Sequence, residues 1–393
     1  MYQLVTQSIV VHIVLLRYTF TYERGCSIAT SDLDNKQPLI LNNYFNIFLP
    51  DNGKEIHIPK NETLIISCIE KNNYQLGSIK SPFVNITCFK DGTFLLGKNK
   101  VTFKDLLCKE YPKPTARVTK KKCGKSLQEI EVGFKIAEQF VQIFDVCFDS
   151  YLKTVFYSHF RLTKWINDRQ NVARVNWRDD FYNKDGAAYT KKNQQKYLNT
   201  LLELPIDSEK IVKDNHLDFL SRGHLSAKAD FYYAHQQSST FFLINAAPQW
   251  QAFNNGNWKT LEIAVRNLAA ARKLDLEIYT GTHEVLEMTT FKTKSKVEIY
   301  LHDNGLPVPL FFWKIVFDPK TETGVAFIGV NNPYITENEL EDVKICRSIS
   351  DRIKWVRFME KRLDKGYSYA CRLKDFVKVV KYLPPLRVAG VLE

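Results

Sequence analysis

Short apolar runs separated by turn residues fill the first third of the chain. Between residues 38 and 108, the runs ETLIISC, FVNITCF and GTFLLG are separated by stretches rich in Asn, Gly, Pro and Lys. Apolar runs of this length between turn residues predict β-strands. We therefore expect a small all-β domain at residues 30–111.

The remainder of the chain mixes helix and strand patterns. Apolar residues recur at helical spacing in LQEIEVGFKIAEQFVQIFDVCF, and a second helix is predicted over residues 258–273. Strands are predicted at TVFYSHFRLT, STFFLINAAP, LDLEIYTG, KVEIYLHD and PLFFWKIVF. Because strands and helices do not alternate regularly, we expect an α+β fold.

A basic segment separates the two parts. Residues 112–125 contain two prolines and six basic residues but no acidic residue. This composition predicts an exposed basic linker, which is either a solvated spacer or a contact for nucleic acid. The second domain is then expected at residues 126–393.

The N-terminus carries an apolar run at residues 9–16, which is too short to span a membrane. We interpret residues 1–29 as a secretory signal segment and expect no stable membrane association. A cleavage site after residue 29 would, however, remove Cys26 and leave an odd number of thiols.

Cysteines and glycosylation sequons also favour an extracellular protein. The eight cysteines are spread along the chain as in a disulfide framework, and Cys346 with Cys371 is the expected C-terminal pair. Sequons for N-glycosylation begin at Asn61 and Asn85. The sequence therefore predicts a secreted, disulfide-bonded glycoprotein.

Basic residues outnumber acidic ones, 55 to 43, which gives a formal net charge of +12. Such a surplus favours anionic partners, of which nucleic acid, acidic glycans and membrane surfaces are the main classes. An ordinary basic surface is the alternative interpretation.

The segment at residues 221–262 combines side chains suited to hydrolysis. His224 has an unperturbed pKa near 6.5, so it can act as a base near neutral pH. Asn254 and Glu262 offer the oxygen ligands that suit hydrated Mg²⁺, and they face one site if the helix begins near Asn254. The alternative is that His224 is a core residue and that the asparagines cap a turn and a helix.

The order of these residues resembles the signature of the DNA/RNA non-specific endonucleases, the ββα-metal nucleases. That signature is an Asp-Arg-Gly-His block, an Asn-x-x-Pro-Gln turn and Asn-x-Gly-x-Trp-x-x-x-Glu. The corresponding residues here are Ser221-Arg222-Gly223-His224, Asn245-Ala246-Ala247-Pro248-Gln249, and Asn254-Asn255-Gly256-Asn257-Trp258 followed by Glu262. The stretch RGHLSAKADF is most similar to the secreted arthropod branch, which includes enzymes that degrade double-stranded RNA.

The resemblance implies a ββα-metal nuclease core with a mainly antiparallel sheet and a catalytic helix. It also implies that His224 is the general base, that Asn254 binds one hydrated Mg²⁺, for which Mn²⁺ substitutes, and that Glu262 holds water molecules of that ion. The catalytic and substrate-binding residues that it implies are His224, Glu262, Arg161, Arg222, Asn245 and Gln249. The phosphate-binding arginine is assigned to Arg161, with Arg222 as the second candidate.

The expected function is that of a secreted endonuclease that hydrolyses RNA, including double-stranded RNA, and DNA. Ser221 departs from the family, because a serine cannot supply the negative charge of the usual aspartate. The alternative is a catalytically weakened homologue that acts as an extracellular nucleic-acid-binding protein. A basic protein that binds glycans or membranes would leave the whole motif unexplained.

Overall fold

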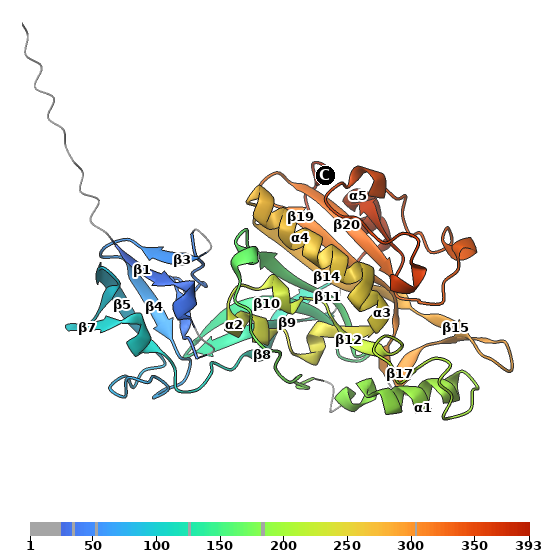
Figure 1. Cartoon of the computed structure of the whole chain (residues 1–393), viewed down its shortest axis with the longest axis horizontal. Helices are drawn as coiled ribbons and strands as arrows, with labels where there is room; N and C mark the ends of the chain where they lie inside the picture. The colour runs from blue at the N-terminus through green and yellow to red at the C-terminus, as the bar shows by residue number, and fades with distance from the viewer. Residues whose placement is uncertain (1–24, 34–35, 52–53, 125–126, 182–184, 303–304) are drawn as a thin grey trace, which may run out of the picture.

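The structure is a computed structural model that describes residues 25–33, 36–51, 54–124, 127–181, 185–302 and 305–393. An N-terminal β-domain lies beside a larger domain built on one wide sheet (Figure 1). Both main sheets are antiparallel, and one long helix packs on the larger sheet. The predicted α+β class is confirmed.

The described residues of the N-terminal domain form only strands, loops and two short 3₁₀ turns. A five-stranded sheet has the order β2-β4-β5-β6-β7, and β1 pairs with β3 in a separate ribbon. Two disulfides, Cys26–Cys88 and Cys68–Cys108, link its strands and loops. The strands are β1 (Cys26–Ala29), β2 (Leu39–Leu41), β3 (Glu55–Ile58), β4 (Thr63–Ser67), β5 (Phe83–Lys90), β6 (Thr93–Leu96) and β7 (Asn99–Thr102).

The larger domain is built on an eight-stranded sheet with the order β21-β20-β19-β14-β11-β10-β9-β8. Disulfides Cys123–Cys147 and Cys346–Cys371 lie in this domain, and the second confirms the predicted C-terminal pair. The strands are β8 (Thr115–Cys123), β9 (Leu127–Ile136), β10 (Gln139–Asp149), β11 (Thr154–Leu162), β14 (Leu276–Val285), β19 (Pro309–Asp318), β20 (Thr323–Val330) and β21 (Ser368–Arg372).

Helices cover both faces of this sheet. Apolar residues of α4 (Lys259–Arg272), such as Leu261 and Leu268, join the core on one face, which agrees with the predicted helix. On the other face, Phe376 of α5 (Leu373–Val379) packs with Trp313 of β19. In the part of the chain that is described, no helix is both long and apolar enough to cross a membrane.

The remaining elements are short. Two-stranded ribbons are β12 (Leu220–His224) with β13 (Ala246–Trp250), β15 (Glu287–Thr289) with β16 (Lys296–Glu298), and β17 (Tyr300–His302) with β18 (Gly305–Pro307). The other helical elements are α1 (Lys191–Leu201), α2 (Ala234–Ser239), α3 (Gln251–Phe253), the π-turn η7 (Asn254–Trp258), and the 3₁₀ turns η1 (Thr30–Asp32), η2 (Phe103–Leu106), η3 (Ile166–Asp168), η4 (Asp185–Tyr189), η5 (Lys228–Asp230), η6 (Leu243–Asn245), η8 (Glu337–Glu339), η9 (Ser350–Arg352) and η10 (Leu363–Lys365).

Two predicted elements were wrong. The segment predicted as a helix near residues 127–148 is the hairpin β9–β10, whose turn holds Ala137 at a φ of 50°. Ile130, Val132 and Phe134 alternate with more polar residues on β9, which is the strand period of two. The predicted strand STFFLINAAP begins as the end of α2 and turn η6, and only its last residues enter β13.

Two predicted boundaries also change. Residues 112–125, predicted as a linker, contribute β8 at the edge of the large sheet, where lysines on an edge strand discourage pairing with other chains. The predicted signal segment, residues 1–29, overlaps β1, and Cys26 is bonded to Cys88. A cleaved signal must therefore end before Cys26. Residues 1–24 lie outside the described residues.

The two domains share an apolar interface. Tyr232 and Tyr233, which follow the His224 segment, belong to the hydrophobic core of the N-terminal domain. The Tyr233 hydroxyl donates a hydrogen bond to the Phe48 carbonyl at 2.7 Å. The N-terminal domain therefore braces the segment that follows the motif.

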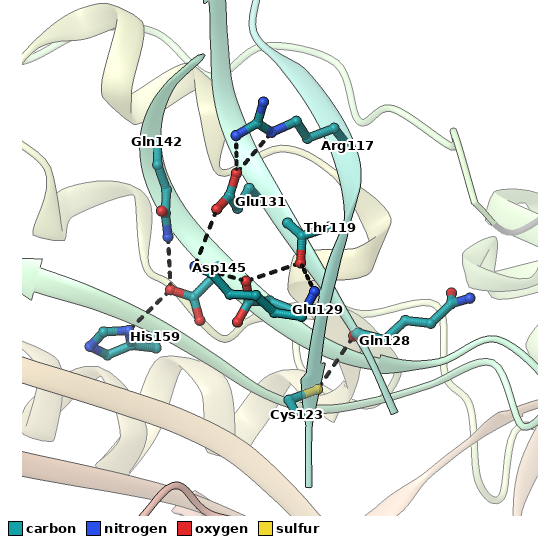
Figure 2. A network of polar contacts seen from close by, with 10 residues as sticks. Arg117, Thr119, Cys123, Gln128, Glu129, Glu131, Gln142, Asp145 and His159 are labelled. Carbon is teal, nitrogen blue, oxygen red and sulfur yellow. Dashed lines mark hydrogen bonds and ion pairs between the residues drawn. The ribbon is translucent and has the colours of Figure 1, made fainter. Parts of the chain in front are cut away.

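A polar network crosses the large sheet on the face opposite α4 (Figure 2). The His159 ring contacts Asp145 Oδ1 at 3.1 Å through Nδ1 and Glu277 Oε2 at 2.9 Å through Nε2, so it links β10, β11 and β14. Burial alone would lower the pKa of His159, but the hydrogen bonds to both carboxylates outweigh it and raise the pKa to about 9.

We expect the stability of the protein to fall between pH 6.5 and pH 9. The folded pKa of His159 lies above the ordinary value of 6.5. Protonated His159 therefore contributes fully to the free energy of unfolding below pH 6.5, and this contribution is lost as the pH rises through 9. The shift corresponds to about 3 kcal/mol. In chemical denaturation, His159→Asn should flatten this part of the pH profile, while His216→Asn at an exposed position should not. An unchanged profile in His159→Asn would contradict the assignment.

Candidate active site

The ribbon β12–β13 followed by the helical segment from α3 to α4 forms a ββα unit. Ser221 pairs with Gln249 and His224 pairs with Ala246 in the ribbon register. A glycine is required between them, because a Cβ on Gly223 would lie 2.4 Å from Oε1 of Gln249. The unit therefore presents His224 at the end of a short strand that is fixed by close packing.

His224 lies in an apolar and cationic environment. Its ring centroid is 4.5 Å from that of Trp177 and 5.0 Å from that of Phe241. Among the described residues, its buried Nε2 has no hydrogen-bond partner. Burial, together with the positive charges of Arg174 and Lys228, lowers the pKa of His224 to about 3. The imidazole is therefore neutral at physiological pH and can accept a proton.

Asn245 fixes the chain directly after His224. Its Nδ2 donates to the carbonyls of Ser226 and Thr240, each at 2.9 Å, and its Oδ1 accepts from the Ser226 N–H at 2.9 Å. The Asn245 carbonyl also accepts from the Leu225 N–H at 2.9 Å. Because Asn245 is fully buried, it positions the His224 loop and does not reach a substrate, contrary to the predicted binding role.

Gln249 has a similar supporting position. It is fully buried with its side chain against Gly223, and neither amide atom has a partner within the described chain. Like Asn245, Gln249 is closed off from substrate, so its predicted binding role is not supported either.

Asn254 is joined to the His224 strand through Ser221. The Ser221 hydroxyl donates to the Gln249 carbonyl at 2.9 Å and accepts from Asn254 Nδ2 at 3.0 Å. This arrangement leaves Asn254 Oδ1 as the atom available to a cation. The helix does not run smoothly from Asn254, because Gly256 has non-helical φ and ψ and α4 begins only at Lys259.

Asn257, in the same turn, holds the C-terminal region. Its buried amide donates to the Gly366 carbonyl at 2.7 Å and accepts from the Met359 N–H at 2.8 Å. The basic segment at residues 354–365 is therefore tied to the turn that carries Asn254.

Glu262, in the first turn of α4, belongs to a buried cluster of charges. Arg266 Nη1 contacts Asp230 Oδ1 at 2.6 Å, and both side chains are buried. Burial and then the negative charge of Asp230 raise the pKa of Glu262 to about 7, while Arg266 and Lys314 oppose the shift. A cation near Glu262 would restore the charged carboxylate near neutral pH.

The donor set fits a hydrated divalent ion. Among the described residues, no group of three His, Cys, Asp or Glu side chains could hold a metal ion by themselves. The Asn254 amide oxygen and the Glu262 carboxylate are oxygen donors. Mg²⁺ prefers such donors, and it keeps several water molecules beside a small number of protein ligands.

The structure does not bring Arg161 to His224. Arg161 and His159 are two residues apart on β11, so both point away from α4, and Arg161 Nη2 lies 3.8 Å from Asp275. By contrast, Ser158 contacts Ser226 of the His224 loop at 2.6 Å. The structure therefore does not place Arg161, the arginine predicted to bind phosphate, at the His224 site, because strand alternation turns it to the other face of the sheet.

Arg222 and His224 share one face of β12, but the Arg222 guanidinium is held elsewhere. Nη2 donates to the Gly186 carbonyl at 2.7 Å, and the group stacks 4.9 Å from the Tyr189 ring centroid. Burial lowers the pKa of Arg222 from its usual range. In this arrangement Arg222 braces turn η4 next to the His224 strand.

Sequence reasoning missed Arg174, Trp177 and Lys228. Arg174 lies 5.6 Å above the Phe241 ring, and Lys228 Nζ donates to the Val172 carbonyl. Arg174 and Trp177 come from an irregular segment between β11 and α1, so no periodicity pointed to them. Lys228 lies in RGHLSAKADF, four residues after the histidine, and this proximity was the available signal.

Comparisons with known proteins agree with this geometry. The profile of the DNA/RNA non-specific endonucleases matches residues 126–376. A salivary endonuclease of Lutzomyia longipalpis is 31% identical over 276 residues, which cover 69% of this chain and 65% of that protein. The salivary protein Tsal2A of Glossina morsitans morsitans is 25% identical over 94% of both chains. A salivary endonuclease of Culex quinquefasciatus is 22% identical over 90% of this chain and 89% of that protein.

Proposed function

Because the chain belongs to the DNA/RNA non-specific endonuclease family, we propose that it is a secreted, metal-dependent endonuclease that hydrolyses phosphodiester bonds of RNA, including double-stranded RNA, and of DNA. The observation that carries this proposal is a neutral, half-buried His224 imidazole beside two cations, Arg174 and Lys228. A base next to positive charge is the arrangement that attack of water on a phosphodiester requires.

In the proposed reaction, His224 takes a proton from water as the water oxygen attacks phosphorus. A new P–O bond forms, the bond to the leaving sugar oxygen breaks, and that oxygen is protonated by another water. Arg174 takes the phosphate-binding role that the sequence assigned to Arg161, and it faces the charge that develops on the phosphoryl oxygens. Trp177 and Phe241 exclude solvent from the ring and keep it neutral.

The ion proposed here is Mg²⁺, for which Mn²⁺ is expected to substitute. Asn254 would hold it directly through Oδ1, and Glu262 would hold its water molecules. When bound, such an ion supplies positive charge near the leaving oxygen. Ser221 keeps Asn254 in place through a hydrogen bond of 3.0 Å, which supports catalysis over the alternative of a binding protein that has lost activity.

Secretion and glycosylation are part of the proposal. The four disulfides and the salivary relatives support an extracellular location. Both sequon asparagines, Asn61 and Asn85, are exposed, and the sequon threonines Thr63 and Thr87 contact each other at 2.9 Å on neighbouring strands. Two glycans would therefore project from one patch of the N-terminal domain.

The range of substrates is tested by digesting DNA, single-stranded RNA and double-stranded RNA of one sequence side by side. We expect cleavage of all three, because the cations at the site contact phosphate, which every nucleic acid carries. Cleavage restricted to one sugar type would contradict the non-specific assignment.

We expect nucleic-acid affinity to fall steeply with salt, and the C-terminal basic segment to contribute more than β8. Lys354, Arg357 and Lys361 are exposed near the turn that carries Asn254, whereas Arg117 and Lys121 of β8 are paired with Glu131 or Glu129. Replacing the three C-terminal residues by glutamine should reduce the salt slope of log K by up to about 3. Glutamines at Arg117, Lys120 and Lys121 of β8 remove the same number of charges and are the matched control, and an equal effect there would refute the difference.

A further inference from the structure

Three cationic side chains, those of Arg174, Lys228 and Arg169, lie in a row that begins beside His224. The charges of Arg174 and Lys228 act on His224, and those of Arg174 and Arg169 act in turn on Lys228. Lys228 Nζ donates to the Val172 carbonyl, and Arg169 Nη1 donates to the Ile166 carbonyl at 3.2 Å. The row of cations therefore runs from the base through Lys228 to Arg169, and backbone contacts fix its far members.

Within the described part of the chain, no ion pair joins Arg169, Arg174 or Lys228 to a carboxylate. The negative charge of Asp230 acts on Arg169, but Asp230 is bonded to Arg266 at 2.6 Å, and the positive charge of Arg266 opposes it at Arg169. Like charges held close together repel each other, and partial burial strengthens the effect. An anion that carries more than one charge would relieve this repulsion.

The loop that carries Arg169 and Arg174 is held before any ligand binds. The backbone N–H of Gln170 donates to the Tyr232 carbonyl at 3.0 Å, and its Oε1 accepts from the Ala234 N–H at 2.7 Å. Its Nε2 donates to Gln37 Oε1 of the N-terminal domain at 2.9 Å. Gln170 therefore joins this loop to both domains and fixes the backbone next to Arg169 before a ligand binds.

We propose that Lys228 and Arg169 form a second phosphate subsite, which holds the phosphate next to the scissile one in a polynucleotide. The inference rests on the proposed nuclease function, in which Arg174 faces the scissile phosphate. Lys228 lies next to that position, and Arg169 lies beyond it. The preferred substrates are then chains with at least two consecutive phosphates, and an isolated phosphodiester fills only half of the site.

The subsite is tested with Lys228→Gln and Arg169→Gln, which remove the charge and keep a polar side chain. Steady-state kinetics are measured on a polynucleotide and on bis(4-nitrophenyl) phosphate, a diester with a single phosphate. We expect KM for the polynucleotide to rise about tenfold in each variant. For Arg169→Gln, whose charge does not act on His224, kcat on the polynucleotide and turnover of the small diester should both stay within about twofold of the wild type.

Lys296→Gln, at an exposed position on β16, is the control for a general loss of positive charge. Thermal unfolding checks that each variant is folded, and Arg169→Gln alone carries the test if Lys228→Gln does not fold. Equal losses of Arg169→Gln on both substrates, or an unchanged KM of Arg169→Gln on the polynucleotide, would overturn the subsite while the wild type remains a nuclease. A wild type that cuts neither substrate under any divalent ion would overturn the proposed function itself.

Discussion

Replacing His224 by alanine is expected to lower the turnover of nucleic acid by roughly 10²–10⁴-fold or more while binding persists. The substitution removes the proton acceptor but leaves Arg174, Lys228 and the Asn254 region in place. Single-turnover cleavage gives the rate, and a filter-binding or anisotropy titration of the same sample gives the affinity. His216→Ala, at an exposed histidine outside the site, is the matched control and should cut at the wild-type rate.

The pH profile of the wild type adds an independent check. Because burial and two cations lower the pKa of His224 to about 3, the base stays unprotonated well below its ordinary value of 6.5. With saturating metal, the acidic loss of kcat should therefore lie below pH 6.5. His235 is no substitute base, because it is fully buried against Phe134 and Tyr233. A His224→Ala variant that cuts nearly as fast as the wild type would place the base elsewhere.

The second large effect is expected at the metal site. Chelation should abolish cleavage, and Asn254→Ala should abolish it or raise the Mg²⁺ concentration for half-maximal activity by at least about tenfold, because the direct oxygen ligand is lost. Because the pKa of Glu262 without a cation is about 7, the Mg²⁺ requirement of the wild type should also rise as the pH falls below 7.

Titrations of activity against Mg²⁺ at two pH values measure both effects. Asn255→Ala is the matched control, since the exposed Asn255 follows Asn254 in the same turn. Full cleavage in excess chelator would refute the metal role, and equal Mg²⁺ requirements in Asn254→Ala and the wild type would refute the assignment of the ligand.

The chemistry of the site was more predictable from sequence than its geometry. The order of unlike residues in the motif identified His224, Asn254 and Glu262 together, and the 3.6-residue period of α4 was long enough to be unambiguous. The helix prediction for residues 127–148 was wrong because a tight turn at Ala137 joins two strands there. The apolar positions of the two strands, read as one run, have the spacing of a helix.

The neighbours of His224 could not be predicted, because tertiary contacts decide them. Arg161 was chosen for its place on an early strand, yet the alternation of side chains along β11 turns it to the opposite face. Arg174 enters the site from an irregular segment that Gln170 and Val172 hold in place. The Glu262 and Arg266 pair, four residues apart on a predicted helix, was a visible signal for the buried charge cluster.

Incubation of the wild-type chain with circular double-stranded DNA and with double-stranded RNA, with Mg²⁺ or with excess chelator, tests whether the protein is a metal-dependent nuclease. We expect the circle to be nicked and then linearised, and the RNA to be fragmented, only when the ion is present. Intact nucleic acid under every divalent ion and pH, with tight binding retained, would contradict it and would identify the chain as a nucleic-acid-binding protein without nuclease activity.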